Sequence, residues 1–442
     1  MSPNIAREVR ILALPAILTS LLQTMVLVVD RAMLGHVSKT SLAAMQIAGP
    51  LEWSVFSIFL AFEVGTIARV GRLVGQREPA RARSAAVVSL MLAVVLGLVV
   101  ALLSPVVLRL APLAAQSASA EVVAASNDYL EVTLLSSPVL FVAAASIAVL
   151  QASGDTRTPL AIGVVANAVH IALNSVLVLG AFGFTPLGMR GCAWGTVVTF
   201  ALEAVLALWA LSRAGRPVSL RRASGVAPLA PEAREVFRVG WPAMLERSLY
   251  HAGFLGYVGI LGLLGDAPMA ANQALISIEA ICFMSADGFG VAAASLVAQK
   301  LGAGEPDQAA RVAKISARDA VLVLTTLGVL SLLGRHALVP LFAKDAAVIA
   351  IGLSAMPVLA IAQPFMATSI VLSQTLRGAG HTRTVLAVST LGAFVVRLSA
   401  TWFFAIRLGL GLPGIWLGST CDWLVRSAIL VPLAARTIAR RA

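Results

Sequence analysis

An aspartate stands inside the first apolar stretch of the chain, in the segment MVLVVDRAMLG at residues 25–35. A charge at the centre of a membrane helix costs about 2.5–3.5 kcal/mol on the insertion scale, which favours a functional role for Asp30 over a structural pair with Arg31 or another helix. Further along, Asn167, His170 and Asn174 recur at spacings that place them on one helix face. A carboxyl group facing this stripe can hold a proton, or bind Na+ together with amide and hydroxyl oxygens.

The elements that position these residues are expected to be membrane helices. Of the 442 residues, 59% are hydrophobic and 12% are charged, whereas soluble domains carry roughly 25% charged residues. The first apolar run is longer than the core of a cleavable signal peptide, so we interpret it as a retained span. The three cysteines have no metal-ligand spacing and indicate no disulfide framework. The composition therefore predicts an all-α polytopic membrane protein.

Apolar stretches long enough to cross about 30 Å predict twelve transmembrane helices. Their expected spans are 9–36, 42–72, 82–110, 122–151, 157–182, 188–213, 233–264, 268–301, 310–334, 345–376, 384–408 and 411–437. Lys and Arg are concentrated in the segments of one side, which by the positive-inside rule places both termini in the cytoplasm. The net charge of +12 follows from this topology and does not indicate nucleic-acid binding. The expected location is the plasma membrane, as in a bacterial or archaeal inner membrane.

The two halves of the sequence resemble each other. A shift of 227 residues aligns Pro15 with Pro242, and a shift of 226 aligns GDTRT at 154–158 with GHTRT at 380–384. The chain is therefore expected to contain one six-helix unit written twice. Because proline removes a helical hydrogen bond, Pro15 and Pro242 are predicted to kink the opening helix of each half, with or without a role in gating.

This repeat predicts the domain organisation. The N-terminal six-helix lobe is expected at 1–214, a cytoplasmic linker at 215–232 and the C-terminal six-helix lobe at 233–442. Six crossings is an even number, so the two pseudo-symmetric lobes run parallel around a central cleft. Such an architecture is typical of transporters that work by alternating access, and a duplicated membrane scaffold is the alternative.

The order and spacing of several motifs resemble the multidrug and toxic compound extrusion (MATE) family over essentially the whole chain. The motifs are Pro15 followed by Asp30, then LAAMQ, RLVGQREPARA, LQASGDTRTPL and GMRGCAWGT, with LVAQKLGAGEPDQA and LRGAGHTRT in the second half. The resemblance implies a secondary antiporter, not an enzyme, that exports amphipathic or cationic organic compounds in exchange for H+ or Na+. A lipid-linked oligosaccharide flippase of the same superfamily is the alternative.

The resemblance also implies a set of partners. Membrane lipid and small organic substrates are expected, without nucleic acid, and the chain is expected to be a monomer. No cofactor is expected beyond the coupling ion, and no metal beyond Na+ at Asp30 if sodium is that ion.

Asp30 matches the first-helix aspartate that takes part in coupling in the family. Asn174, His170, Asn167 and Thr196 are the other residues that we place at a cation-coupling site by this resemblance. The family pattern N-x-x-x-D is here His170 to Asn174, so an amide replaces the second carboxylate. Asp30 is therefore expected to work with neutral neighbours.

A possible second ion or substrate site lies in the second half, at Glu246, Tyr250, Glu279 and Asp287. Some sodium-coupled relatives place a glutamate eight residues after the proline of their seventh helix, a position that is Tyr250 here, with Glu246 one turn earlier. For Glu246 the alternative is a charge pair with Arg397 or Arg247. For Glu279, and for Glu52 at the equivalent position of the first half, the alternative is a role in the fold.

Overall fold

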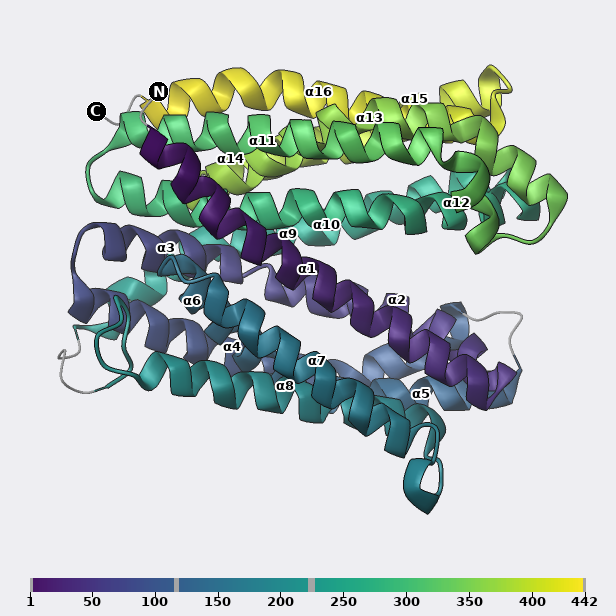
Figure 1. Ribbon diagram of the computed structural model, residues 1–442, viewed down its shortest axis with the longest axis horizontal. Helices are drawn as coiled ribbons and strands as arrows, with labels where there is room; N and C mark the ends of the chain where they lie inside the picture. Colours follow the sequence, from purple (N-terminus) through teal and green to yellow (C-terminus); the bar gives the residue numbers. More distant parts are fainter. Residues whose placement is uncertain (1–2, 115–118, 222–226, 440–442) are drawn as a thin grey trace. The chain divides into compact units, whose positions relative to one another are not determined.

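A computed structural model of the chain describes residues 3–114, 119–221 and 227–439, and every regular element in these ranges is helical (Figure 1). Helices satisfy the backbone polar groups within one segment, as a lipid environment requires. The first half contains α1 (Pro3–Val37), α2 (Lys39–Leu60), α3 (Glu63–Gly75), α4 (Pro79–Ala114), α5 (Ala120–Leu135), α6 (Ser137–Ala152), α7 (Arg157–Leu177), the short η1 (Ala181–Gly183) and α8 (Gly188–Ser212).

The second half repeats this order of long helices. It contains α9 (Leu229–Gly262), α10 (Asp266–Gly302), α11 (Pro306–Leu333), α12 (Arg335–Phe342), α13 (Ala346–Gly378), α14 (Thr382–Thr390), η3 (Leu391–Arg397), α15 (Leu398–Trp402), η4 (Phe403–Arg407) and α16 (Gly411–Ala439). The segments η3 and η4 are π-helical. The succession α14 to η4 is therefore one continuous span with two locally widened turns.

The predicted twelve spans correspond to these helices. Within the described ranges eight helical segments are long and apolar enough to cross a membrane, and the pair α5 and α6, bent by 56°, makes a ninth. The remaining three are α1, α9 and α16, with 35, 34 and 29 residues, which also have the length to cross. The chain is an all-α polytopic membrane protein.

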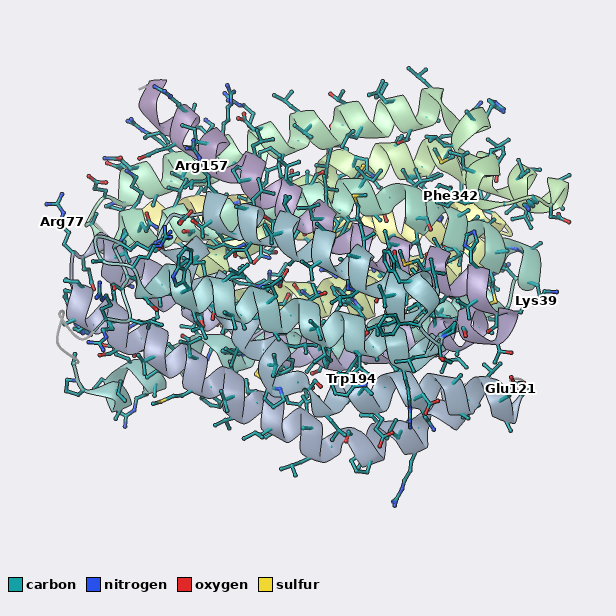
Figure 2. All side chains as sticks on the ribbon, turned by 60° about the horizontal axis from the view of Figure 1, so that its bottom comes forward. Lys39, Arg77, Glu121, Arg157, Trp194 and Phe342 are labelled. Carbon is teal, nitrogen blue, oxygen red and sulfur yellow. The ribbon has the colours of Figure 1, made fainter. Side chains whose placement is uncertain are left out.

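One compact unit comprises residues 21–240. Helices α3, α4, α6, α7 and α8 pack together in it, and their apolar faces enclose a core that includes Val70, Leu150 and Leu211. Within this unit Arg77 lies at one end, and Lys39 and Glu121 lie at the other (Figure 2). The predicted topology likewise places Arg77 and Lys39 on opposite sides of the membrane.

The other compact unit comprises residues 1–20 and 241–442. Helices α10, α11, α13 and α16 pack together in it (Figure 1). The first turns of α1 belong to this unit, because Ile5 and Val9 are buried in a core with Leu296 and Leu376. An ion pair of 2.8 Å between Arg10 and Asp319 also attaches α1 to α11.

The unit boundaries differ from the predicted lobes of 1–214 and 233–442. Each opening helix begins in the unit of the other repeat: α1 changes unit after Ser20, and α9 changes unit after Gly240. Pro15 and Pro242 lie inside α1 and α9 within a few residues of these points. The predicted linker at 215–232 is shorter in the structure, since α9 already begins at Leu229, and its residues 222–226 lie outside the described ranges.

Candidate functional site

Asp30 is buried in the unit of residues 21–240, on α1. Its Oδ1 lies 2.6 Å from Nε2 of His170 and accepts a hydrogen bond of 2.7 Å from Nδ2 of Asn174. Both partners are buried on α7, one helical turn apart, as the sequence spacing predicted. The structure therefore brings together Asp30, His170 and Asn174.

The hydrogen bonds around His170 indicate which of its ring nitrogens faces an acceptor. The hydroxyl of Thr199 donates to the carbonyl of Gly195 at 2.7 Å, so at 3.1 Å it accepts from Nδ1 of His170. With Nδ1 donating, the contact between Nε2 and Oδ1 of Asp30 contains one proton, carried by the imidazole ring or by the carboxyl group. His170 and Asp30 are thus placed to share one proton across this contact.

A second acidic side chain, Glu52 on α2, lies in the same unit. Its Oε2 accepts a hydrogen bond of 3.1 Å from the hydroxyl of Tyr129 on α5. Thr133, one turn further along α5, lies close to Glu52 and donates to the carbonyl of Tyr129 at 3.2 Å. Glu52 is close enough to Asp30 for like charges to repel. The thiol of Cys192 on α8 hydrogen-bonds with Asp30 and lies within electrostatic range of Glu52.

Two residues expected at the site make other contacts. Asn167 donates to the carbonyl of Gly163 on its own helix at 2.8 Å. The hydroxyl of Thr196 donates to the carbonyl of Cys192 at 3.1 Å. Among the contacts found for the described residues, neither side chain reaches Asp30.

Sequence reasoning missed part of this group. Thr199 and Cys192 occur in an apolar helix, and neither a charge nor a periodic pattern in the sequence marks them. Glu203, one turn beyond Thr199, was also missed, and it lies within electrostatic range of His170. For Glu52 there was a signal, because an acid recurs at the equivalent position of the second half. That recurrence did not reveal which side chains surround it.

In the other unit Glu246 forms an ion pair with Arg377. The two side chains are 2.6 Å apart at their closest, and both are largely buried. The charge pair considered from the sequence is therefore present, with Arg377 as the partner. Of the two candidates named from the sequence, Arg247 lies within electrostatic range and Arg397 pairs with Asp422 instead. Glu246 is thus neutralised within its own unit.

The other acids expected at a second site also lie near guanidinium groups. Asp287 accepts a hydrogen bond of 3.2 Å from Gln374 and lies within electrostatic range of Arg247. Glu279 faces Arg397 and hydrogen-bonds with Gln363. The ring of Tyr250 packs edge-on against His251, with 5.9 Å between the ring centroids.

A further charge cluster, which the sequence did not predict as a site, lies between η3 and α16. Asp422 is fully buried, with Arg426 at 2.5 Å and Arg397 at 2.8 Å. Both guanidinium groups also lie 5.2 Å from the ring of Trp423. The acids Glu246 and Asp422 therefore have arginine partners, whereas the contacts found for Asp30 are with histidine, asparagine and cysteine.

The sequence of the whole chain matches known proteins. The MatE family model matches residues 15–176 and 242–403, one match in each half. A curated relative named probable multidrug resistance protein NorM, from Thermotoga maritima, is 27% identical over 430 residues that cover 97% of this chain and 91% of the relative. A protein of the same name from Bradyrhizobium diazoefficiens is 29% identical and covers 97% of this chain and 93% of the relative.

Solved structures show the same fold. One described as the outward-facing conformation of a multidrug resistance MATE family transporter of the MOP superfamily aligns with a TM-score of 0.90. The alignment covers 98% of this chain and 96% of that chain, with 18% sequence identity. The helical architecture in two halves is thus shared at low identity.

Proposed function

The chain belongs to the MatE family of membrane transporters, and on that premise we propose that it exports amphipathic or cationic organic compounds in exchange for protons. Asp30 is the coupling carboxyl group, and His170 shares its proton. The observation that carries the proposal is the 2.6 Å contact between Nε2 of His170 and Oδ1 of Asp30, with Nδ1 of His170 donating to Thr199.

The ligands around Asp30 favour a proton over sodium as the coupling ion. Hard cations are bound by oxygen ligands. Oδ1 of Asp30 is instead approached by two nitrogen atoms, Nε2 of His170 and Nδ2 of Asn174.

A transporter that exchanges proton for substrate alternates between a conformation open to the cytoplasm and one open to the outside. Exchange requires that proton and substrate bind these two conformations with different affinities. Loss of the shared proton leaves Asp30 as a buried carboxylate without an arginine or lysine among the partners found for it. A buried charge without a counter-ion is costly, so an organic cation on one side of the membrane and a proton on the other compete to neutralise it. Binding of either one releases the other.

We propose that the chain acts as a monomer in the inner membrane with both termini cytoplasmic. The excess of Lys and Arg on one set of connecting segments supports this orientation. Within the unit of residues 21–240, the opposite placement of Arg77 and Lys39 is consistent with it (Figure 2).

The test is efflux of ethidium from proteoliposomes on which a proton gradient or a sodium gradient is imposed separately. We expect the proton gradient alone to drive efflux, and Asp30→Asn to slow it at least about tenfold, which corresponds to about 1.4 kcal/mol. The control is Asp128→Asn, because Asp128 forms an exposed ion pair with Arg190 and that pair has no part in the proposal. Undiminished proton-driven efflux in Asp30→Asn would contradict the assignment, and efflux driven by sodium would contradict the choice of ion.

A further inference from the structure

The surroundings of Glu52 differ from those of the other buried acids. Its carboxyl group accepts a hydrogen bond from the hydroxyl group of Tyr129, which is neutral. Tyr129 is itself fully buried, so bulk water does not replace it as the partner of Glu52. The acid at the equivalent position of the second half, Glu279, faces the guanidinium group of Arg397 instead.

We propose that Glu52 is a second proton-carrying group of this unit, so that one transport cycle moves two protons. One proton is the one shared by Asp30 and His170, and the other is bound as the carboxylic acid of Glu52. This inference rests on the proposed proton-coupled function and adds the number of protons exchanged at the same site.

The charge balance of the unit supports two protons. A carboxylate buried among neutral groups is unfavourable, and two carboxylates close together repel each other. The titratable groups that face Glu52 are Asp30 on α1, Tyr129 on α5 and Cys192 on α8, and none of them supplies a positive charge. The positive charge that His170 can carry is hydrogen-bonded to Asp30.

The hydroxyl groups around Glu52 also allow its proton to leave. Once Glu52 releases the proton, its carboxylate accepts the hydrogen bond from Tyr129. Its repulsion with Asp30 links the two sites, because loss of one proton makes loss of the other less favourable until a positively charged substrate binds. A bound organic cation lowers the cost of each nearby carboxylate, so its binding is expected to favour release of both protons.

The experiment counts protons released when a cation binds. Full-length purified protein in weakly buffered detergent solution is titrated with tetraphenylphosphonium, release is followed with a pH-sensitive dye, and bound cation is measured by calorimetry. We expect about two protons per bound cation in the parent, and about one in Glu52→Gln and in Asp30→Asn. Glutamine keeps the shape of Glu52 and an oxygen that accepts from Tyr129, so the fold is expected to persist.

A second measurement does not depend on substrate. Infrared difference spectra between acidic and basic pH report carboxyl groups that lose a proton, and Glu52→Gln is expected to lack one protonated-carboxyl band that Asp128→Asn retains. If Glu52→Gln keeps every infrared band, Glu52 is structural and only this inference fails. The same conclusion follows if Glu52→Gln releases as many protons as the parent while Asp30→Asn releases fewer. If Asp30→Asn also releases as many as the parent, the proposed coupling at Asp30 fails as well.

Discussion

Gly195 on α8 lies directly against the side-chain oxygen of Asn174 on α7, and a Cβ atom at this glycine would overlap that oxygen. Asn174 is fully buried and donates from its nitrogen to Asp30. Gly195 lies within the regular part of α8, so the glycine is required for the close approach of the two helices. The packing of α8 therefore determines which way the amide of Asn174 points.

Gly195→Ala is expected to displace the amide of Asn174 and to break its hydrogen bond with Asp30. A hydrogen bond to a charged group contributes about 1.5–3 kcal/mol, so proton-driven efflux of ethidium should fall at least about tenfold. The matched control is Gly163→Ala on α7, where a Cβ would meet its nearest atom, Cδ1 of Leu22, at an ordinary 3.8 Å. Equal efflux rates in the two variants would show that the position of Asn174 does not matter for coupling.

The contact between Asp30 and α7 could be predicted from the sequence because helical periodicity sets it. His170 and Asn174 are one turn apart, and the buried polar face of a membrane helix has to meet another polar group. The number of spans and the duplicated architecture were predictable for a similar reason, since both depend on apolar length and on self-similarity.

The partners of the other acids depend on how distant helices are rotated about their axes. Glu246 meets Arg377 on a helix 131 residues further along, and no local pattern specifies that Arg377 rather than Arg397 points toward it. The points at which α1 and α9 pass from one compact unit to the other could not be predicted from the sequence for a related reason. Both helices run without interruption through that point, and a continuous apolar pattern does not indicate which neighbour each turn packs against.

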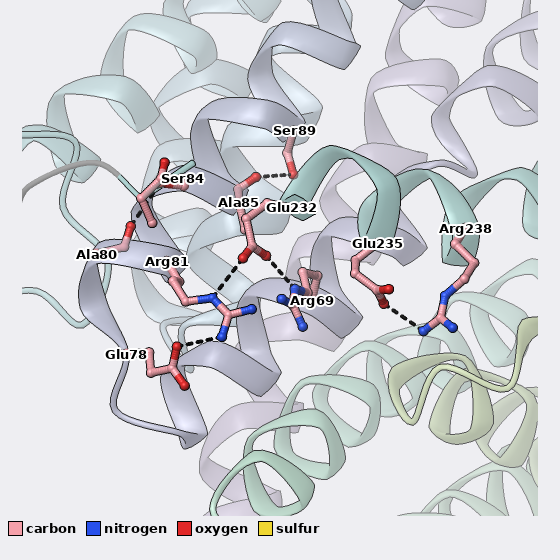
Figure 3. A network of polar contacts seen from close by, with 11 residues as sticks. Arg69, Glu78, Ala80, Arg81, Ser84, Ala85, Ser89, Glu232, Glu235 and Arg238 are labelled. Atoms are coloured by element: carbon pink, nitrogen blue, oxygen red, sulfur yellow. Dashed lines mark hydrogen bonds and ion pairs between the residues drawn. The ribbon is translucent and has the colours of Figure 1, made fainter. Parts of the chain in front are cut away.

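An ion-pair network at the start of α9 provides a test of stability (Figure 3). Glu232 is buried and accepts from Arg69 at 2.6 Å and from Arg81 at 2.9 Å, which attaches α9 to α3 and α4. Glu232→Gln removes the carboxylate from Arg69, while Arg81 keeps its ion pair with Glu78 at 2.9 Å. Breaking a buried pair such as that of Arg69 and Glu232 costs about 3–5 kcal/mol. We expect the thermal unfolding midpoint in detergent to fall by several degrees.

The neighbouring residue Glu235 is the control for that change. It pairs with Arg238 at 2.6 Å, and the side chain of Arg238 is 63% exposed. Exposed pairs contribute about 0–1 kcal/mol, so Glu235→Gln should leave the midpoint nearly unchanged. A fall of the same size in both variants would mean that burial of Glu232 does not strengthen its ion pairs.

Asp155 in the turn before α7 predicts a dependence of stability on pH. Its Oδ1 accepts from the backbone N–H of Thr158 at 2.9 Å, and its Oδ2 lies 2.5 Å from Arg216. Burial alone would raise the pKa of Asp155, but the hydrogen bonds from Thr158 and Arg216 and the charge of Arg216 together hold this pKa below its usual value. Because the folded pKa lies below the unfolded one, the stabilisation is complete above the unfolded pKa and is lost as the pH falls through the folded pKa.

Asp155→Asn is therefore expected to lower the free energy of unfolding by about 1–2 kcal/mol at neutral pH, from the weakened cap and the lost ion pair. The difference between parent and variant should shrink as the pH falls below about 4, where the unfolded carboxyl group also takes up a proton. Denaturant unfolding at neutral and at acidic pH measures it. A difference that stays constant over this range would rule out the charge of Asp155 as its cause.

The turns after α3 and α10 occupy equivalent positions of the two halves but contain different residues. Gly304 has φ +76°, and Arg77 has φ 57°, both in the left-handed region. In each turn the next N–H bonds back to a helix carbonyl, from Glu305 to Lys300 at 2.9 Å and from Glu78 to Leu73 at 3.1 Å. This geometry is that of a helix C-terminus that favours glycine.

Substitutions in the two turns should consequently have unequal effects. Gly304→Ala places a Cβ atom in the left-handed region, which costs about 1–2 kcal/mol. Because alanine restricts the unfolded chain, about 0.4–1 kcal/mol of this cost is offset. The unfolding midpoint should therefore fall. Arg77→Gly relieves strain of similar size, and the entropy gained by the unfolded chain offsets much of it, so its midpoint should stay the same or rise slightly. Thermal unfolding of the two variants beside the parent measures both effects. A lower midpoint for Arg77→Gly would mean that the arginine side chain stabilises its turn by more than the left-handed backbone costs.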